Sequence, residues 1–181
     1  MTERTNNLIV VTGYFGAPIE ETARRIAADK AFALVSLDEE IVKRDGRSIL
    51  RICMLEGEHS YRNKEYEILD ILAKAPEQIV GVPEQIIGVP EQADAATTTL
   101  SSGVVVWCGD GVLHDDMSRE IALAGELVIA GEDMSEEQLW AQARQTENSY
   151  HAFMAFGTEE QKRKAFHELY ERQKVLFDKC K

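Results

Sequence analysis

The stretch LIVVTGYFGAPIEETARRIA, residues 8–27, decides the fold because it joins a strand to a helix through a glycine-containing loop. Its first four residues form an uninterrupted apolar run, as in a strand that is buried on both faces. From residue 19 the spacing becomes helical, and Pro18 stands where its fixed φ suits a first helical turn. A strand, a short loop and a helix in this order form the first unit of an α/β fold.

The rest of the chain repeats this alternation. The apolar patterns predict strands at about 7–12, 32–36, 104–107 and 127–129, and helices at about 19–30, 37–44, 48–55, 61–74, 115–124, 135–146 and 158–179. We therefore expect a three-layer α/β/α fold with a mainly parallel central sheet, in one domain over residues 1–181.

One segment interrupts this alternation. The tripeptide Pro-Glu-Gln occurs at positions 76, 83 and 90, so a seven-residue unit is repeated, and small and polar residues follow up to residue 102. Because each unit contains proline, a continuous helix is excluded. We expect residues 75–102 to be an exposed insertion, either a loop with short extended pieces or a hairpin. Its repeat is either a duplication without a role or an edge that binds a protein partner.

Composition excludes several classes of function. The formal net charge is −12, which argues against a nucleic-acid or anionic-membrane partner, since both need basic surfaces. No apolar run approaches the roughly 20 residues that span a bilayer, and the first residues lack the hydrophobic stretch of a signal peptide. The three cysteines, like His114 with its acidic neighbours, show no metal-type spacing, so we expect no metal site and a cytoplasmic protein with reduced thiols.

The loop after the first strand has the frame of a phosphate-binding loop without its chemistry. In the motif G-x-x-x-x-G-K-[ST], backbone amides hold the phosphates, lysine reaches the outer ones and the hydroxyl binds Mg²⁺. Counted from Gly13 as the first glycine of the motif, Pro18 stands at the second glycine, Ile19 at the lysine and Glu20 at the hydroxyl residue. Gly16 is the other glycine of the loop. Carboxylates in this turn can bond the free amides themselves and would repel a phosphate.

Further motifs resemble the shikimate kinase family along nearly the whole chain outside residues 75–102. They are DEEIVKRDG at 38–46, LEGEHSYRNKE at 55–65, GDG at 109–111, SRE at 118–120, and Leu169 with Arg172 and Phe177 in the last helix. The resemblance implies a P-loop kinase-like fold with a degenerate phosphate loop. The segment at 55–65 is the most specific of these matches.

The resemblance also implies a substrate-binding half. In that family an aspartate holds substrate hydroxyls, while two arginines and a glycine loop hold the shikimate carboxylate. Carried over to this chain, the substrate-binding residues are Asp38, Arg62, Gly109, Asp110, Gly111 and Arg172. Arginine suits a carboxylate because its planar fork matches it. Asp110 is an added acid that disfavours an acidic ligand unless it pairs with Arg62 or Arg172.

The phosphoryl-donor half departs from the family. Besides Ile19 and Glu20, Ser36 replaces the aspartate that positions Mg²⁺, and residues 147–150 contain no lid arginine. Phosphoryl transfer depends on such charges. We therefore expect no catalytic residue and no cofactor, and a protein that binds a small acidic or polyhydroxylated metabolite or a protein partner. The alternative is an active shikimate kinase or related small-molecule kinase that uses Mg²⁺ and ATP through a rearranged donor site.

Overall fold

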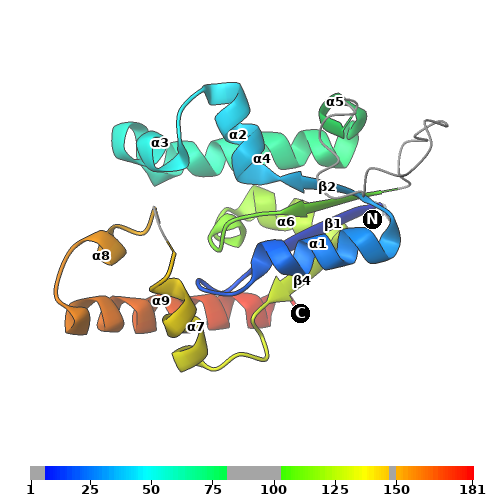
Figure 1. Ribbon diagram of the computed structural model, residues 1–181. Coiled ribbons are helices and arrows are strands. Elements are labelled where there is room, and N and C mark those ends of the chain that lie inside the picture. The colour runs from blue at the N-terminus through cyan, green and yellow to red at the C-terminus, as the bar shows by residue number, and fades with distance from the viewer. Residues whose placement is uncertain (1–6, 81–102, 147–149) are drawn as a thin grey trace, which may run out of the picture.

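The computed structural model describes residues 7–80, 103–146 and 150–181. Its centre is a parallel sheet in the order β2–β3–β1–β4, shown in Figure 1. The strands are β1 (Leu8–Gly13), β2 (Ala33–Ser36), β3 (Val104–Trp107) and β4 (Glu126–Ala130). The apolar β1 lies between β3 and β4, with Ile9 in register with Val105. The four predicted strands and their parallel arrangement are confirmed, with ends that differ by at most one residue.

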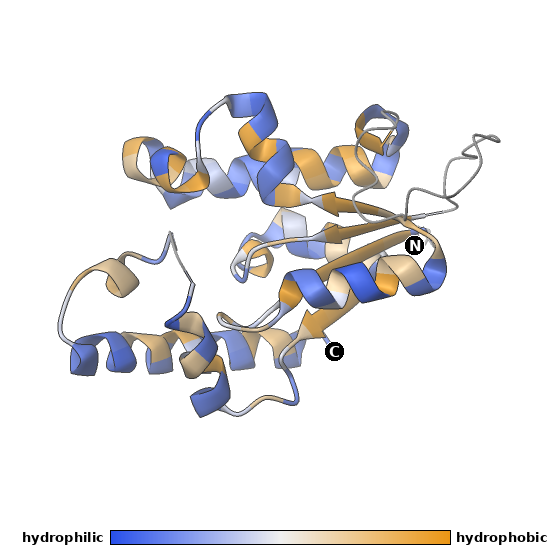
Figure 2. Ribbon diagram, in the orientation of Figure 1, coloured by the Kyte–Doolittle hydropathy of each residue, from blue (hydrophilic) through white to orange (hydrophobic). Residues whose placement is uncertain are grey.

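Helices cover both faces of this sheet. Helix α1 (Ile19–Lys30) packs Ala23 and Ala27 on the side of β1 that carries Ile9 and Val11. The alternate residue Val10 faces a larger core with α4 (Glu58–Lys74), α6 (Asp116–Ala124) and α9 (Glu159–Lys179). In Figure 2 the strands are orange while the helices carry blue outer faces. The predicted three-layer α/β/α fold is therefore confirmed.

Shorter helices lie around the sheet. They are α2 (Leu37–Asp45), α3 (Ile49–Glu56), α5 (Glu77–Val80), α7 (Glu136–Ala143), α8 (Ala152–Ala155) and the 3₁₀ turn η2 (Val112–His114). Figure 1 shows α2, α3 and α4 beside β2, and α7, α8 and α9 on the side of β4. The carboxyl ends of the strands open between these two groups of helices.

Two short helices were not predicted. Helix α5 occupies the start of the segment expected to be a loop or hairpin, and α8 precedes the last helix. The rest of the repeat, residues 81–102, lies outside the described residues, so its interpretation stays a prediction. The predicted helix 135–146 ends at Ala143. Among the described residues, none of the helices is both long and apolar enough to cross a membrane.

Candidate functional site

The candidate site is a hollow of about 750 Å³ at the carboxyl end of the sheet. Strand β1 leads into the loop at residues 13–18, β2 leads to Asp38 at the start of α2, and β3 leads into residues 108–111. Parallel strands bring such segments together at one edge, where ligands bind in α/β folds. Thr12 fixes two of these segments to each other, because its Oγ1 donates to the carbonyl oxygen of Gly109 at 2.8 Å.

The loop after β1 is closed by contacts within the chain. Gly16 has a φ of +93°, and a Cβ there would overlap the carbonyl group of Leu139 in α7, so the position requires glycine. Four backbone amides of the loop donate to oxygen atoms of the chain at 2.9–3.2 Å: those of Tyr14, Phe15, Ala17 and Ile19. A phosphate site needs amides that point at the ligand. These four amides are already used.

The start of α1 adds negative charge to the hollow. Glu20, Glu21 and Arg24 all line it. The predicted bonds between these carboxylates and the loop amides are wrong for Glu20, which accepts from the Arg24 guanidinium at 2.6 Å. The spacing of four residues brings the two side chains together on one helix face. Arg24 is the only basic side chain among the described residues that line the hollow, and Glu20 neutralises it.

Two residues at the junction of β2 and α2 have different roles. Ser36 is the N-cap of α2, because its hydroxyl accepts from the backbone amide of Glu39 at 3.2 Å. Asp38 lines the hollow, and its Oδ1 accepts from the Tyr61 hydroxyl at 2.7 Å. Burial raises the pKa of Asp38, although the hydrogen bond from Tyr61 opposes the shift. Asp38 therefore lies at the hollow, while its predicted role as an acceptor of ligand hydroxyls stays a prediction.

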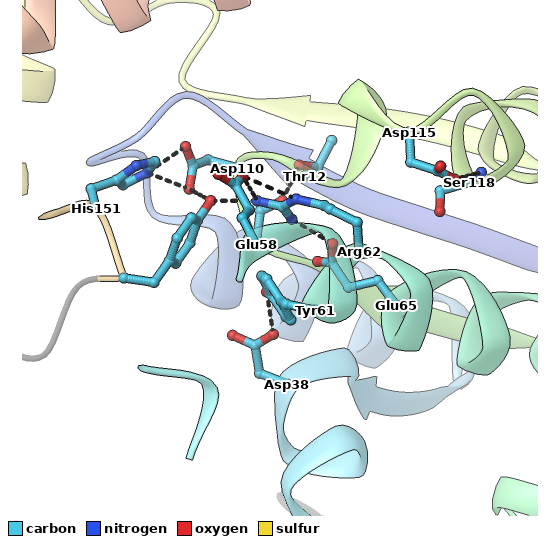
Figure 3. A network of polar contacts seen from close by, with 12 residues as sticks. Thr12, Asp38, Glu58, Tyr61, Arg62, Glu65, Asp110, Asp115, Ser118 and His151 are labelled. Carbon is cyan, nitrogen blue, oxygen red and sulfur yellow. Dashed lines mark hydrogen bonds and ion pairs between the residues drawn. The ribbon is translucent and has the colours of Figure 1, made fainter. Parts of the chain in front are cut away.

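Arg62 is buried among acids and aromatic rings (Figure 3). Its Nη2 donates to Glu58 at 2.9 Å and to the Tyr150 hydroxyl at 3.0 Å, and its Nη1 pairs with Glu65. The guanidinium also lies over the Tyr61 ring, 4.6 Å from the ring centroid. Two carboxylates of α4 therefore neutralise the cation that was predicted to hold a ligand carboxylate.

Glu65 is fully buried beside Arg62. Burial raises the pKa of Glu65 to about 7, although the charge of Arg62 opposes the shift. Among the described residues, its second oxygen, Oε1, has no hydrogen-bond partner. The buried Glu65 carboxyl group therefore binds or releases a proton near neutral pH, which makes the free energy of unfolding depend on pH in that range.

Asp110 is a buried carboxylate surrounded by donors. Its Oδ2 accepts from Gln173 Nε2 at 2.8 Å, and its Oδ1 accepts from the Tyr150 hydroxyl at 2.9 Å. The Nε2 atom of His151 lies 2.9 Å from Oδ2 (Figure 3). Burial by itself raises the pKa of Asp110, but the charge of His151 and the hydrogen bonds from His151 and Tyr150 outweigh it and lower the pKa.

The structure brings together most of the predicted substrate-binding residues. Gly109 and Asp110 line the hollow with Asp38. A Cβ at Gly111 would overlap the Arg62 guanidinium, so glycine permits this close approach. Arg172 is not brought to this cluster. It is exposed and lies with His114 and Val175 in a separate hollow of about 490 Å³.

Gln173, the residue after Arg172, lies in the cluster where Arg172 was expected. Gln173 is buried, bonds Asp110, and accepts from the Phe15 amide at 3.2 Å through Oε1. Leu169, Gln173 and Phe177 are spaced by four residues and share the buried face of α9. A polar residue within this apolar stripe was the signal that could have identified Gln173. No comparable pattern marks Tyr150 or His151, which reach the site through tertiary structure.

The side chains and amides around the hollow differ from those of a metal site and of a nucleotide site. Within the described ranges, no three His, Cys, Asp or Glu side chains form a group that could hold a metal ion. Asp115, next to His114, is the N-cap of α6 and accepts from the Ser118 amide at 2.7 Å. The four used loop amides and the acidic rim differ from a triphosphate site, which needs free donors and positive charge.

Comparisons with known proteins give one consistent result. The family model for shikimate kinase matches residues 16–174. Shikimate kinase from Buchnera aphidicola is 27% identical over 139 residues, which are 77% of this chain and 64% of that protein. Shikimate kinase from Chlorobium limicola is 32% identical over 77 residues, which are 42% of this chain and 39% of that protein. The chain thus spans less than two thirds of the length of these curated relatives.

Solved structures agree on the fold. A shikimate kinase from Acinetobacter baumannii in complex with shikimate has a TM-score of 0.68 at 18% identity, covering 98% of this chain and 81% of that chain. The enzyme from Bacteroides thetaiotaomicron has a TM-score of 0.69 at 16% identity, covering 95% and 82%. At such identities the likeness concerns the fold alone.

Proposed function

The chain belongs to the shikimate kinase family, and from that premise we propose that it no longer transfers phosphate from ATP. In this proposal the hollow at the carboxyl end of the sheet binds a small metabolite, or a surface of the chain binds a protein partner. Asp38, with one oxygen bonded to Tyr61, accepts hydroxyl groups of a polyhydroxylated ligand. No catalytic residue and no cofactor are assigned.

One observation carries the loss of phosphoryl transfer. Where a nucleotide phosphate needs cations, the hollow is lined by Glu20 and Glu21, and its basic residue Arg24 is paired with Glu20 at 2.6 Å. Ile19 adds an apolar side chain to the same wall. Each lost donor to a transferring phosphoryl group costs roughly a factor of 10² to 10⁵ in rate. Several such losses together support an inactive protein.

The test measures nucleotide binding and turnover separately. Calorimetry with Mg·ATP should show no binding up to millimolar concentration, and a micromolar signal would refute the proposal. A coupled assay with ATP and shikimate should remain at background. ATP-dependent phosphorylated product would instead support the alternative, an active shikimate kinase or related kinase with a rearranged donor site.

Among the residues that the structure describes, that alternative has one candidate cation in the hollow. Arg24 would have to leave Glu20 and reach the nucleotide. Arg144, at the end of α7, is exposed, and its Nη2 lies 3.6 Å from the Glu159 carboxylate at the start of α9. An Arg24→Gln variant of an active enzyme would lose turnover. In an inactive protein it would change nothing in the coupled assay.

A further inference from the structure

The contacts of Asp110 have the form of a bound carboxylate in a receptor. Three side-chain donors from different parts of the chain converge on it: Tyr150 and His151 before α8, and Gln173 within α9. Gln173 is 1% exposed and Asp110 is 6% exposed, so these contacts are shielded from water. Hydrogen bonds to a shielded, ionised carboxylate are among the strong ones in proteins.

The same carboxylate ties three segments of the site together. Gln173 joins Asp110 to the backbone of Phe15 in the glycine loop. His151 stacks near the Phe15 ring, with centroids 4.5 Å apart. The Tyr150 hydroxyl links Asp110 to Arg62. The Asp110 side chain therefore lies at the meeting point of these segments, and Gln173 Nε2 also lies 3.3 Å from the Asp110 backbone carbonyl, to which it donates.

We propose that the Asp110 side chain is an internal ligand. It occupies a carboxylate receptor built by Tyr150, His151 and Gln173, and by filling that receptor it excludes free carboxylic acids from the hollow. The receptor stands on the contacts themselves, whereas the exclusion of acidic metabolites rests on the proposed binding function.

The charges around the hollow also support the exclusion of acids. An incoming carboxylic acid would have to displace Asp110 or pair with a basic side chain elsewhere in the hollow. Arg62 is paired with Glu58 and Glu65, and Arg24 is paired with Glu20. Asp38, Glu20 and Glu21 line the remaining wall. An acid in the wild-type hollow would face like charges at short range.

The test removes the internal ligand and supplies a free one. An Asp110→Ala variant keeps the three donors and opens a hole about as large as formate. We expect its melting temperature to fall below that of the wild type and to rise again with sodium formate or acetate, in a saturable manner. A ligand of three heavy atoms binds no tighter than about 1 mM, so the titration extends well above this concentration.

Three controls separate the receptor from general effects. Sodium chloride at equal concentration reports the effect of salt. Asp110→Asn keeps the hole filled, so formate should have no effect beyond that of chloride. Asp115→Ala removes a carboxylate outside the receptor, the N-cap of α6 that accepts from the Ser118 amide, and should lose stability without rescue. A rescue absent from Asp110→Ala, or equally large in Asp115→Ala, would overturn the proposal.

A second measurement applies if Asp110→Ala folds too poorly for a melting curve. The refolding yield of Asp110→Ala would be compared in formate and in chloride, where a higher yield in formate supports the receptor and equal yields refute it.

Shikimate tests the exclusion of acids from the hollow. It should shift the melting temperature of Asp110→Ala and leave that of the wild type unchanged. Micromolar binding of shikimate by the wild type would overturn the exclusion. Mg·ATP binding by the wild type would refute the proposed function and leave the formate result standing.

Discussion

At the scale of single residues, Ile19 and Glu20 separate this chain from a working phosphate loop. Both line the hollow, and Glu20 also holds Arg24. The double variant Ile19→Lys with Glu20→Ser restores one cation and frees another. We expect it to bind Mg·ATP only weakly, with no turnover, because four loop amides stay bonded within the chain and Ser36 still caps α2. Calorimetry measures the binding.

The single variant Glu20→Ser separates the effect of the freed Arg24 from the effect of the added lysine, since it frees Arg24 without adding lysine. Micromolar affinity in the double variant would mean that the loop amides rearrange around a phosphate. That outcome would contradict the closed loop described above.

Glu65 predicts how stability depends on pH. Its pKa in the folded protein is about 7, above the ordinary value of 4.5. The folded state therefore binds more protons between these values, so the free energy of unfolding falls as pH rises from about 5 to 7. The fall amounts to about 3 kcal/mol at most. Urea unfolding at several pH values measures it.

The matched control lies on the same helix. Glu65→Gln should remove most of this slope, whereas Glu67→Gln, at an exposed position of α4, should leave it unchanged. Measurements at one high salt concentration keep the general charge of the molecule from contributing. An unchanged slope in Glu65→Gln would show that Glu65 stays ionised throughout. Asp110, with its lowered pKa, acts in the opposite sense and only at lower pH.

At the scale of elements, the loop after β1 is held by its packing under α7. Gly16 combines a positive φ with contact against the Leu139 carbonyl group, whereas Gly46 has a positive φ of +81° and open space around it. Gly16→Ala should therefore lower the free energy of unfolding by about 3 kcal/mol, from backbone strain and overlap together. Gly46→Ala should cost about 1 kcal/mol, from strain alone.

Chemical unfolding of both variants measures the difference. Equal losses would mean that the loop moves away from α7 at little cost. In that case the closed form of the glycine loop would not be enforced by packing.

The elements that sequence predicted well are those whose burial is periodic. Strand β1 and helix α9 carry apolar residues at the spacing of a buried strand and of a helix with one buried face. Helix α8 has four residues and none of them is buried, so no period could reveal it. The start of α4 at Glu58 instead of residue 61 follows from Gly57, whose φ of +84° permits the turn between α3 and α4.

The candidate site was predictable where the resemblance supplied a motif. Asp38, Arg62 and the glycine loop at 109–111 lie together, as expected. The partners of these residues depend on tertiary contacts over large separations in the chain, such as Gln173 with Asp110 and Tyr150 with Arg62. Arg172 was carried over from the resemblance, but the helical period places Gln173 inside and Arg172 outside.

At the scale of the whole molecule, negative charge extends well beyond the hollow. The formal net charge is −12 at pH 7, and the isoelectric point is about 4.8. Like charges spread over a compact chain repel one another, and unfolding relieves this repulsion. The ion pairs described above do not cancel it, because acidic residues outnumber basic ones by 32 to 20.

This excess predicts that salt stabilises the protein at neutral pH. Raising the salt from about 0.1 M to 1 M shortens the screening length from about 10 Å to 3 Å. If the free energy of unfolding rises by about 1 kcal/mol, the melting temperature rises by about 2–4 °C. Near pH 5 the net charge is close to zero, so the same salt should have little effect there. Equal rises at both pH values would assign the effect to hydration, and a fall at neutral pH would mean that attractive ion pairs outweigh the net repulsion.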